Sequence, residues 1–259
     1  LDARPIPGVA LLTLNRGGRR NALSAAMMTA LAAALDATAG DESVRAVILA
    51  ADGPAFCAGH DLKEMTARRA DADGGEAFYD ALFRQCSALM LKIVRHPRPV
   101  IAMVHGLATA AGCQLVASCD LAVAAEGASF ATPGDNIGLF CSTPMVALSR
   151  NLGRKQALEM LLTGDFIDAQ KALQQGLVNR VVSIDALDAE LDRFSRSILA
   201  KSSLAIGLGK QMFYKQLEMG LDAAYQYASE VMACNMMSED AAEGIDAFVA
   251  KRKPQWKNR

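Results

Sequence analysis

Residues 99–120, which read PVIAMVHGLATAAGCQLVASCD, decide the fold of this chain. The apolar run 100–104 has the length and the β-branched residues of a buried strand. Residues 110–112, Ala-Ala-Gly, leave almost no side-chain volume, so a ligand can approach their backbone closely. A helix that begins near Ala111 has unpaired N–H groups in its first turn, and these attract an anion. Close packing of a strand against a helix, without any ligand, explains the same residues and stays open as the alternative.

The composition indicates a globular protein with a sizeable core. The chain has 259 residues, 52% of them hydrophobic, which fits one large domain or a core with a smaller appendage. Lys and Arg number 27 against 28 Asp and Glu, so we expect no nucleic-acid partner. No apolar run approaches the length of a membrane span. The sequence also lacks the GxxxxGK[ST] and GxSxG signatures of nucleotide hydrolysis and serine hydrolases.

The cysteines and histidines predict neither disulfides nor a metal site. None of the six cysteines forms a CxxC pair, and most lie among apolar residues, which is typical of reduced thiols. Three scattered histidines without an HExxH motif argue against zinc. The polar N-terminal stretch LDARPIPG does not resemble a signal peptide. We expect a cytoplasmic protein, with the mitochondrial matrix as the alternative if a targeting segment has been removed.

Strand-like and helical segments alternate up to about Val182, and only helices are predicted beyond it. This order indicates an α/β core followed by a helical C-terminal part. Ser24 and Asp61 are each placed to cap the start of a helix. The polar segment 68–75 is a candidate flap, and residues 133–144 are predicted to form a loop.

Several sequence blocks resemble the enoyl-CoA hydratase/isomerase, or crotonase, superfamily. The main ones are RRNALS at 19–24, FCAGHDLKEM at 56–65 and HGLATAAGCQLVASCDLAVAA at 105–125. Further matching blocks extend the resemblance from about residue 9 to 256. It implies an α/β spiral of repeated ββα units with a C-terminal helical trimerisation region. The implied division is an acyl-CoA-binding core, 1–197, and a helical oligomerisation region, 198–259.

The resemblance also implies an oxyanion hole, formed by the main-chain N–H groups of His60 and Ala111. In the family, two such groups hold the thioester oxygen of an acyl-CoA while it gains negative charge. Both residues act through the backbone, so the role does not require the imidazole of His60. A side-chain role of His60 as acid or base is the lesser alternative.

The expected contacts to coenzyme A follow from the same resemblance. Ala22, Ala58, His60 and Leu62 resemble the lining of the adenine and pantetheine site. Lys63 resembles a phosphate-facing lysine, and Arg20 or its neighbour Arg19 is a candidate for the pyrophosphate. Lys251 and Lys253 resemble basic residues that reach the nucleotide, in some members from a neighbouring subunit. No tightly bound cofactor is expected, because coenzyme A is the carrier part of the substrate.

The sequence departs from the family at the positions of both catalytic glutamates. Gln114 stands at the first position and Gly134 at the second, with Asp135 one residue late. A third position used by some isomerases falls near Ser142. Because each lost acid or base costs about 10²–10⁴-fold in rate, conventional hydration should be weak. Placing glutamates at 114 and 134 together is expected to raise it.

Two functions follow from these departures. The first is an enzyme of fatty-acid or related acyl-CoA metabolism, a lyase or isomerase that draws its acid or base from Gln114, Asp135, His60 or Cys141. The alternative is a non-catalytic acyl-CoA binder. In either case the expected partner is a small-molecule acyl-CoA, and the expected assembly is a homotrimer or a dimer of trimers.

Overall fold

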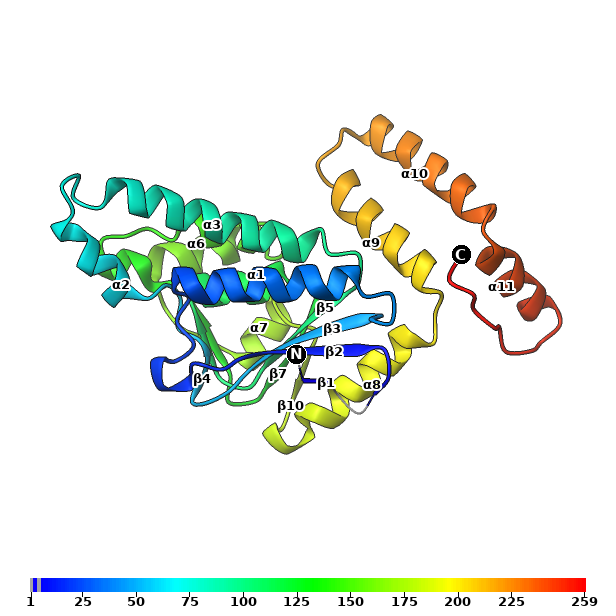
Figure 1. The fold of residues 1–259 in the computed structure, drawn as a ribbon, viewed down its shortest axis with the longest axis horizontal. Coiled ribbons are helices and arrows are strands. Elements are labelled where there is room, and N and C mark those ends of the chain that lie inside the picture. Colours follow the sequence, from blue (N-terminus) through cyan, green and yellow to red (C-terminus); the bar gives the residue numbers. More distant parts are fainter. Residues whose placement is uncertain (1, 4–5) are drawn as a thin grey trace.

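The computed structural model describes residues 2–3 and 6–259, and within them the strands form two sheets (Figure 1). The larger sheet has the order β1-β2-β3-β5-β7-β10, and it is parallel except where β1 pairs with β2. Its strands are β1 (Asp2–Ala3), β2 (Val9–Leu14), β3 (Ala46–Ala51), β5 (Val100–Val104), β7 (Leu121–Ala125) and β10 (Arg180–Val182). The smaller sheet has the order β4-β6-β8-β9, with β4 (Ala55–Cys57), β6 (Leu107–Thr109), β8 (Ser129–Ala131) and β9 (Ile167–Asp168).

Consecutive strands pass from the larger sheet to the smaller one, and a helix then returns the chain. Thus β3 leads to β4, β5 to β6 and β7 to β8. The helices that follow these pairs are α2 (Leu62–Ala67) with α3 (Glu76–Val94), then α4 (Ala111–Ser118), then α5 (Ser142–Leu148) with α6 (Arg154–Thr163). This spiral of ββα units confirms the predicted crotonase-like fold.

The larger sheet is covered on both faces, which explains its continuous apolar strands. On one face its side chains join the main core with helices α1 (Ala25–Gly40) and α3. On the other face, Ile48 and Ile101 pack against Leu187 and Leu191 of α8 (Leu187–Leu199). The remaining elements are η1 (Gly17–Arg19), η2 (Arg68–Ala70), η3 (Pro133–Ile137), η4 (Ile184–Ala186) and α7 (Ala169–Gln175).

The predicted helix caps are present. Ser24 Oγ accepts a hydrogen bond from the Met27 amide, and Asp61 accepts from the amides of Lys63 and Glu64. The prediction of a loop at 133–144 is wrong in part, because this segment contains η3 and the start of α5. Pro144 lies in the first turn of α5, where a proline removes no helical hydrogen bond, so it does not prevent the helix.

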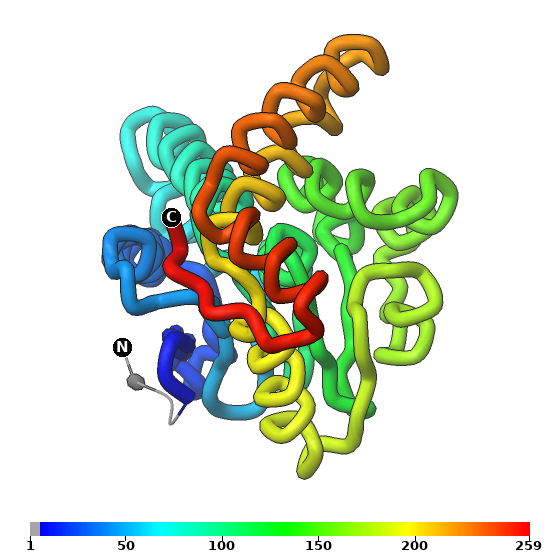
Figure 2. The backbone as a smooth tube through the Cα atoms, turned by 90° about the vertical axis from the view of Figure 1, so that its right-hand side faces the viewer, coloured from blue at the N-terminus to red at the C-terminus, as the bar shows by residue number. Residues whose placement is uncertain are grey.

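Three helices after the core form an arm that extends away from it (Figures 1 and 2). They are α9 (Ser203–Gln216), α10 (Leu221–Met236) and α11 (Glu239–Val249). The predicted boundary between residues 197 and 198 lies in the last turn of α8, which packs on the sheet. Among the described helices, none has the length and apolar character needed to cross a membrane.

A buried ion pair fixes the arm to the last residue of the stretch 99–120. Lys210 Nζ in α9 lies 2.6 Å from Asp120 Oδ2, and Tyr214 donates a hydrogen bond of 2.9 Å to Asp120 Oδ1. The same carboxylate accepts a hydrogen bond from the Val100 amide, and Lys210 Nζ also donates hydrogen bonds to the carbonyls of Ile93 and Arg98. Its three hydrogen-bond acceptors offset part of the cost of removing the ammonium from water, although burial still lowers the pKa of Lys210.

Candidate functional site

Two small-residue bends touch each other at the edge of the smaller sheet. Gly59 has φ +89°, and a Cβ placed on it would lie 2.9 Å from Ala110 Cβ and 3.4 Å from Ala111 N. A Cβ on Gly112 would collide with the carbonyl of Cys57. Both positions therefore require glycine, and their contact brings the main chain of His60 beside the start of α4.

The strand pairing explains this contact. Strands β4 and β6 are parallel, with Ala55 opposite Leu107 and Cys57 opposite Ala108. Their carboxyl ends therefore lie at the same edge of the sheet, where the chain bends at Gly59 and at Ala110. Ala110 has φ +50° and ψ −119°, a backbone conformation that is rare outside glycine. A strained residue at this point turns the chain directly into α4.

The amides of His60 and Ala111 are both free at this edge. The carbonyls just before these two amides are paired, because Gly59 O accepts from the Leu23 amide at 2.7 Å and Ala110 O accepts from the Gln114 amide at 3.0 Å. No hydrogen bond within the described residues uses the N–H of His60 or that of Ala111. Since Ala111 is the first residue of α4, its N–H also carries the partial positive charge of the helix start. The arrangement can hold one oxygen that bears negative charge.

A third segment flanks the two bends and carries two of the predicted contacts. The Ala58 amide donates to the carbonyl of Arg20 at 3.0 Å, which places Ala22 next to the bend at Gly59. Asn21 holds this segment and was not predicted from the sequence. It is fully buried in a left-handed conformation (φ +53°), and its amide donates to the carbonyls of Asp52 and Ala55. An asparagine directly after two arginines was the available signal, since Asn tolerates positive φ.

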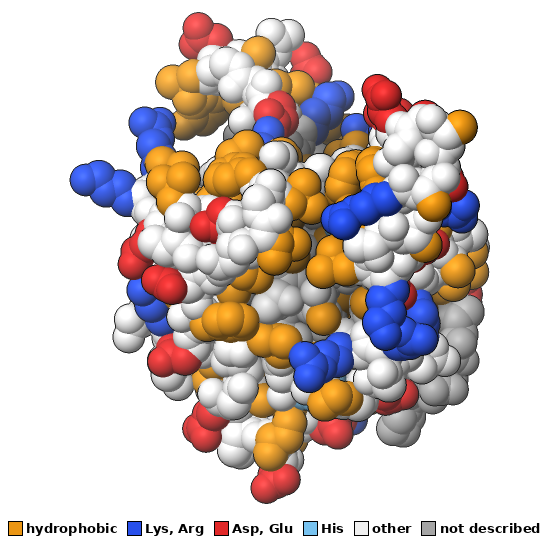
Figure 3. Space-filling model, turned by 90° about the vertical axis from the view of Figure 1, so that its left-hand side faces the viewer, with side chains coloured by type: hydrophobic (Ala, Val, Ile, Leu, Met, Phe, Trp, Pro, Cys, Tyr) orange, Lys and Arg blue, Asp and Glu red, His pale blue; other side chains and the backbone are white. Residues whose placement is uncertain are grey.

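The charged candidates lie at opposite ends of the molecule. Arg20 and Lys63 are exposed and Leu62 is 51% exposed, all near the bend at Gly59. Figure 3 views the molecule from the α2 side and shows hydrophobic side chains gathered there, with Lys and Arg side chains beside them. Lys251 follows α11, which lies at the end of the long axis opposite α2 (Figure 1). Within one chain, therefore, Lys251 is not brought to the site.

Gln114 lies in α4 behind the free amide of Ala111. It is 3% exposed, and its Oε1 accepts a weak hydrogen bond of 3.8 Å from the Cys86 thiol of α3. Its amide nitrogen makes no hydrogen bond to any described residue. An amide cannot take up a proton near neutral pH, so Gln114 can orient a polar group but cannot act as a base.

Neither residue of the second acid/base position offers a carboxylate to the site. A side chain on Gly134 would collide with the carbonyl of Leu139 and would lie 2.8 Å from Cys141 Sγ. Asp135 Oδ1 lies 2.8 Å from the Cβ position of Gly164, shortly before β9, and is buried without a hydrogen-bond partner among the described residues. This loop conformation leaves no room for a glutamate at 134, so we expect the double replacement at 114 and 134 to raise hydration only if the loop moves.

The imidazole of His60 lies close to the two backbone amides. It stands edge-on to Phe83, with ring centroids 5.5 Å apart. His60 is half-buried, and its two ring nitrogens are buried without a hydrogen-bond partner among the described residues. Burial lowers the pKa of His60 below its ordinary value of 6.5, although the Leu23 backbone and Glu64 oppose the shift. The ring is therefore neutral at pH 7.

The thiols near the site are protonated. Burial raises the pKa of Cys57, Cys86 and Cys113 to about 12. The pKa of Cys141 is also raised, mainly by desolvation. Because a thiolate is the reactive form, these residues behave as small apolar side chains at neutral pH.

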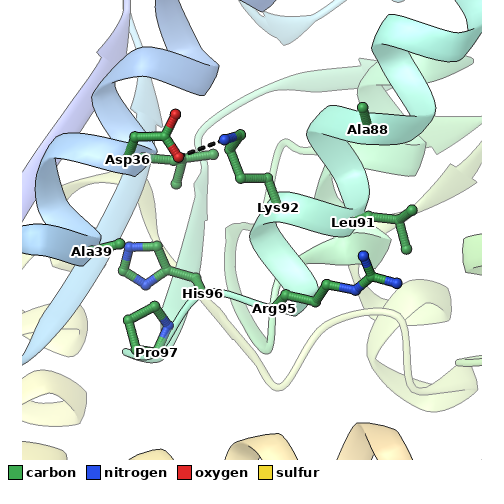
Figure 4. A pocket seen from close by; sticks show the side chains of 9 residues that line it. Asp36, Ala39, Ala88, Leu91, Lys92, Arg95, His96 and Pro97 are labelled. Atoms are coloured by element: carbon green, nitrogen blue, oxygen red, sulfur yellow. Dashed lines mark hydrogen bonds and ion pairs between the residues drawn. The ribbon is translucent and has the colours of Figure 1, made fainter.

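A separate cavity lies between α1 and α3 (Figure 4). It has a volume of about 430 Å³, and Lys92 pairs with Asp36 across it at 2.5 Å. Its lining is Leu35, Asp36, Ala39, Ala88, Leu91, Lys92, Arg95, His96 and Pro97. It contains none of the predicted site residues, and it lies about two turns of α3 beyond Phe83.

Comparison with known proteins agrees with this geometry. A family model described as enoyl-CoA hydratase/isomerase matches residues 6–259. The mouse protein named enoyl-CoA hydratase domain-containing protein 3, mitochondrial, is 50% identical over 98% of this chain and 83% of its own length. A crystal structure of an enoyl-CoA hydratase from Mycobacterium smegmatis is 57% identical, with a TM-score of 0.92 over 96% of this chain and 95% of that one. The human domain-containing protein 3 structure is 48% identical, with a TM-score of 0.93 over 98% and 99% of the two chains. The chain therefore belongs to the enoyl-CoA hydratase/isomerase family and has its crotonase fold.

Proposed function

We propose that this protein binds acyl-CoA thioesters and stabilises negative charge on the thioester oxygen through the amides of His60 and Ala111. The supporting observation is the contact between Gly59 and Ala111, which places two unpaired N–H groups at one edge of the smaller sheet. Such preorganised donors stabilise an enolate or a tetrahedral intermediate more than the neutral thioester. The reaction class is accordingly chemistry at the α-carbon or at the thioester carbonyl of an acyl-CoA.

Hydration of a plain enoyl-CoA is proposed to be weak. Gln114 and Gly134 have no carboxylate, and the buried Oδ1 of Asp135 lies beside Gly164. Hydratases activate and protonate around one water with two carboxylates, and this chain has neither in place.

The same observation supports a second candidate, a non-catalytic acyl-CoA binder. The backbone donors are retained while the collision at Gly134 closes the space for the second glutamate. A protein that only holds the thioester needs the donors and no acid or base. The two candidates differ in whether bound acyl-CoA loses an α-proton.

Exchange of the α-protons of butyryl-CoA in D₂O, followed by mass spectrometry, separates the two candidates, with calorimetry as the measure of binding. Binding with exchange supports the enzyme, and binding without exchange supports the binder. Absence of binding to butyryl-CoA and to free coenzyme A overturns both. Gly112→Ala, which drives a Cβ into the Cys57 carbonyl, should weaken binding, whereas Gly209→Ala has open space and serves as its control.

The contacts to coenzyme A are proposed from position and charge. Arg20, Lys63 and Leu62 lie exposed near the bend at Gly59, with Ala22 and Ala58 beside the backbone donors. Lys251 is proposed to reach the nucleotide of a neighbouring copy, since it lies at the far end of its own chain.

A homotrimer or a dimer of trimers is proposed for the assembly. The arm exposes large apolar side chains, which a neighbouring copy would cover. They are Phe213, Leu217, Leu221, Tyr225, Met232, Met236, Met237, Phe248 and Val249. Light scattering on the wild type and on Tyr225→Asp/Met232→Asp tests this, and a monomeric mass for the wild type contradicts it.

The proposed compartment is a reducing one, the cytoplasm or the mitochondrial matrix. The six cysteines are all free, and five of them are buried. The mouse and human relatives are named as mitochondrial proteins, which favours the matrix for proteins of that group.

A further inference from the structure

The cavity between α1 and α3 exists because small side chains line both of its walls. Ala39 of α1 and Ala88 of α3 leave a space of about 430 Å³, which the buried side chain of Leu35 also lines. Ligand pockets have volumes of about 300–1,000 Å³. A single turn of an α-helix with its side chains, about 10 Å wide and about 5.4 Å long, already occupies roughly 400 Å³. The cavity therefore suits one small molecule better than a segment of another chain.

One face of α3 forms a wall of the cavity that is both apolar and cationic. Ala88, Leu91, Lys92 and Arg95 follow the i, i+3, i+4, i+7 spacing of a single helical face. The hydrophobic side chain of Leu91 is 46% exposed. Figure 4 shows the Arg95 guanidinium beside Leu91. An alkyl chain along this wall would cover Leu91, and the end of that chain would meet a cation.

The charged residues of the lining leave one positive charge in excess. They are Lys92, Arg95 and Asp36, and Lys92 already pairs with Asp36. Within the described residues, no ion pair or hydrogen bond uses the Arg95 guanidinium. His96 adds no charge at pH 7, since burial lowers its pKa below the ordinary value and its Nε2 lies 3.2 Å from the Thr38 hydroxyl. The unpaired guanidinium therefore sets the preferred charge of a ligand.

We propose that this cavity binds an amphipathic monoanion, namely a short alkyl chain with a carboxylate at one end. The chain lies against Leu91 in the gap between the two alanines. The carboxylate pairs with the guanidinium of Arg95, whose planar fork matches two carboxylate oxygens. A cationic head group would be repelled there. The cavity contains none of the residues at the bend of Gly59, so the inference is independent of the proposed thioester function.

Calorimetry with octanoate tests this inference. Octylammonium, which has the same chain and the opposite charge, and acetate, which has the head group without the chain, are the matched ligands. The wild type is expected to bind one octanoate per chain. It should bind the other two at least about tenfold more weakly, because each lacks either the charge-assisted hydrogen bonds or the apolar burial.

Two variants locate the binding. Arg95→Gln should weaken octanoate binding about tenfold, because it removes the charged partner of the carboxylate. Ala88→Phe places a ring in the gap and should abolish binding. Arg154→Gln is the matched control, since Arg154 is an exposed arginine of α6 that does not line the cavity. Thermal unfolding of each variant establishes that it is folded, as expected for exposed positions.

Three results would overturn the inference. The first is that the wild type does not bind octanoate. The second is that binding survives unchanged in Arg95→Gln or in Ala88→Phe, because octanoate then occupies another part of the molecule. The third is equal affinity of the wild type for octanoate and octylammonium, which would remove the role of the guanidinium.

Discussion

The carbonyl oxygen of Leu139 lies where a side chain on Gly134 would begin, closer than the 3.0 Å that real Cβ atoms respect. The Leu139 amide also donates a hydrogen bond of 2.8 Å to the Gly134 carbonyl. Both backbone polar groups of Leu139 therefore lie against Gly134. Position 134, where the family resemblance implies the second glutamate, is thus filled by main chain.

Gly134→Ala is expected to destabilise the protein. Its Cβ meets backbone rather than a flexible side chain, so the loop must move, at a cost of about 1–3 kcal/mol. The melting temperature should fall by roughly 2–10 °C for a chain of this size. Gly127→Ala is the control, because nothing lies within 4 Å of its Cβ position. An unchanged melting temperature for Gly134→Ala would show that the loop is open in solution.

Gln114→Glu combined with Gly134→Glu is expected to give little gain in hydration of crotonyl-CoA. The glutamate at 134 has no room unless the loop opens, and without it the new carboxylate at 114 lacks the second carboxylate that the reaction needs. The rate of hydration, measured by loss of enoyl absorbance, checks this. A gain of about 10²-fold or more would mean that the loop adapts.

His60→Leu is expected to stabilise the ligand-free protein. Both nitrogens of the wild-type ring are buried without a geometric hydrogen-bond partner among the described residues, and each such group costs about 1–3 kcal/mol. Leucine fills a similar volume without polar atoms, so the urea midpoint should rise. A lower midpoint would indicate that a bound water already pairs the ring. Asn at the same position should give a smaller change.

Acidification should destabilise the wild type more than His60→Leu. The pKa of His60 is lowered in the folded state, so between that value and the unfolded value near 6.5 the unfolded chain binds more protons. The contribution of His60 to the free energy of unfolding is therefore largest above about pH 6.5, and it is lost as the pH decreases through the folded pKa. Urea unfolding at pH 7.5 and 5.5 measures the difference. Equal losses in the two proteins would show that the His60 ring is solvated. His96, whose pKa burial also lowers, contributes to both proteins alike.

Lys210→Met should lower the free energy of unfolding by about 3–5 kcal/mol, because it leaves the carboxylate of Asp120 partly buried without its cation. The double variant Asp120→Asn/Lys210→Met should recover part of this loss. Lys92→Met removes a more exposed ion pair and should cost less than about 1 kcal/mol. Urea unfolding checks all three, and equal losses for Lys210→Met and Lys92→Met would contradict the role of the buried pair.

The sequence by itself determined the local elements and the inventory of the site. Val100–Val104 forms β5 because β-branched and apolar residues suit a buried strand, and the side-chain oxygens of Ser24 and Asp61 cap their helices as local chemistry requires. The bare residues 110–112 predicted the start of α4, and the absence of glutamate at 114 and 134 was readable directly.

Only the tertiary structure decided what surrounds those residues. Three features depend on contacts between segments that are distant in sequence, or on the conformation of a loop. They are the collision between Gly134 and Leu139, the position of Asp135 beside Gly164 and the covered ring of His60. Sequence patterns report which face of an element is apolar, but not how loops fill the space above a sheet, because loop conformation is set by packing rather than by periodicity.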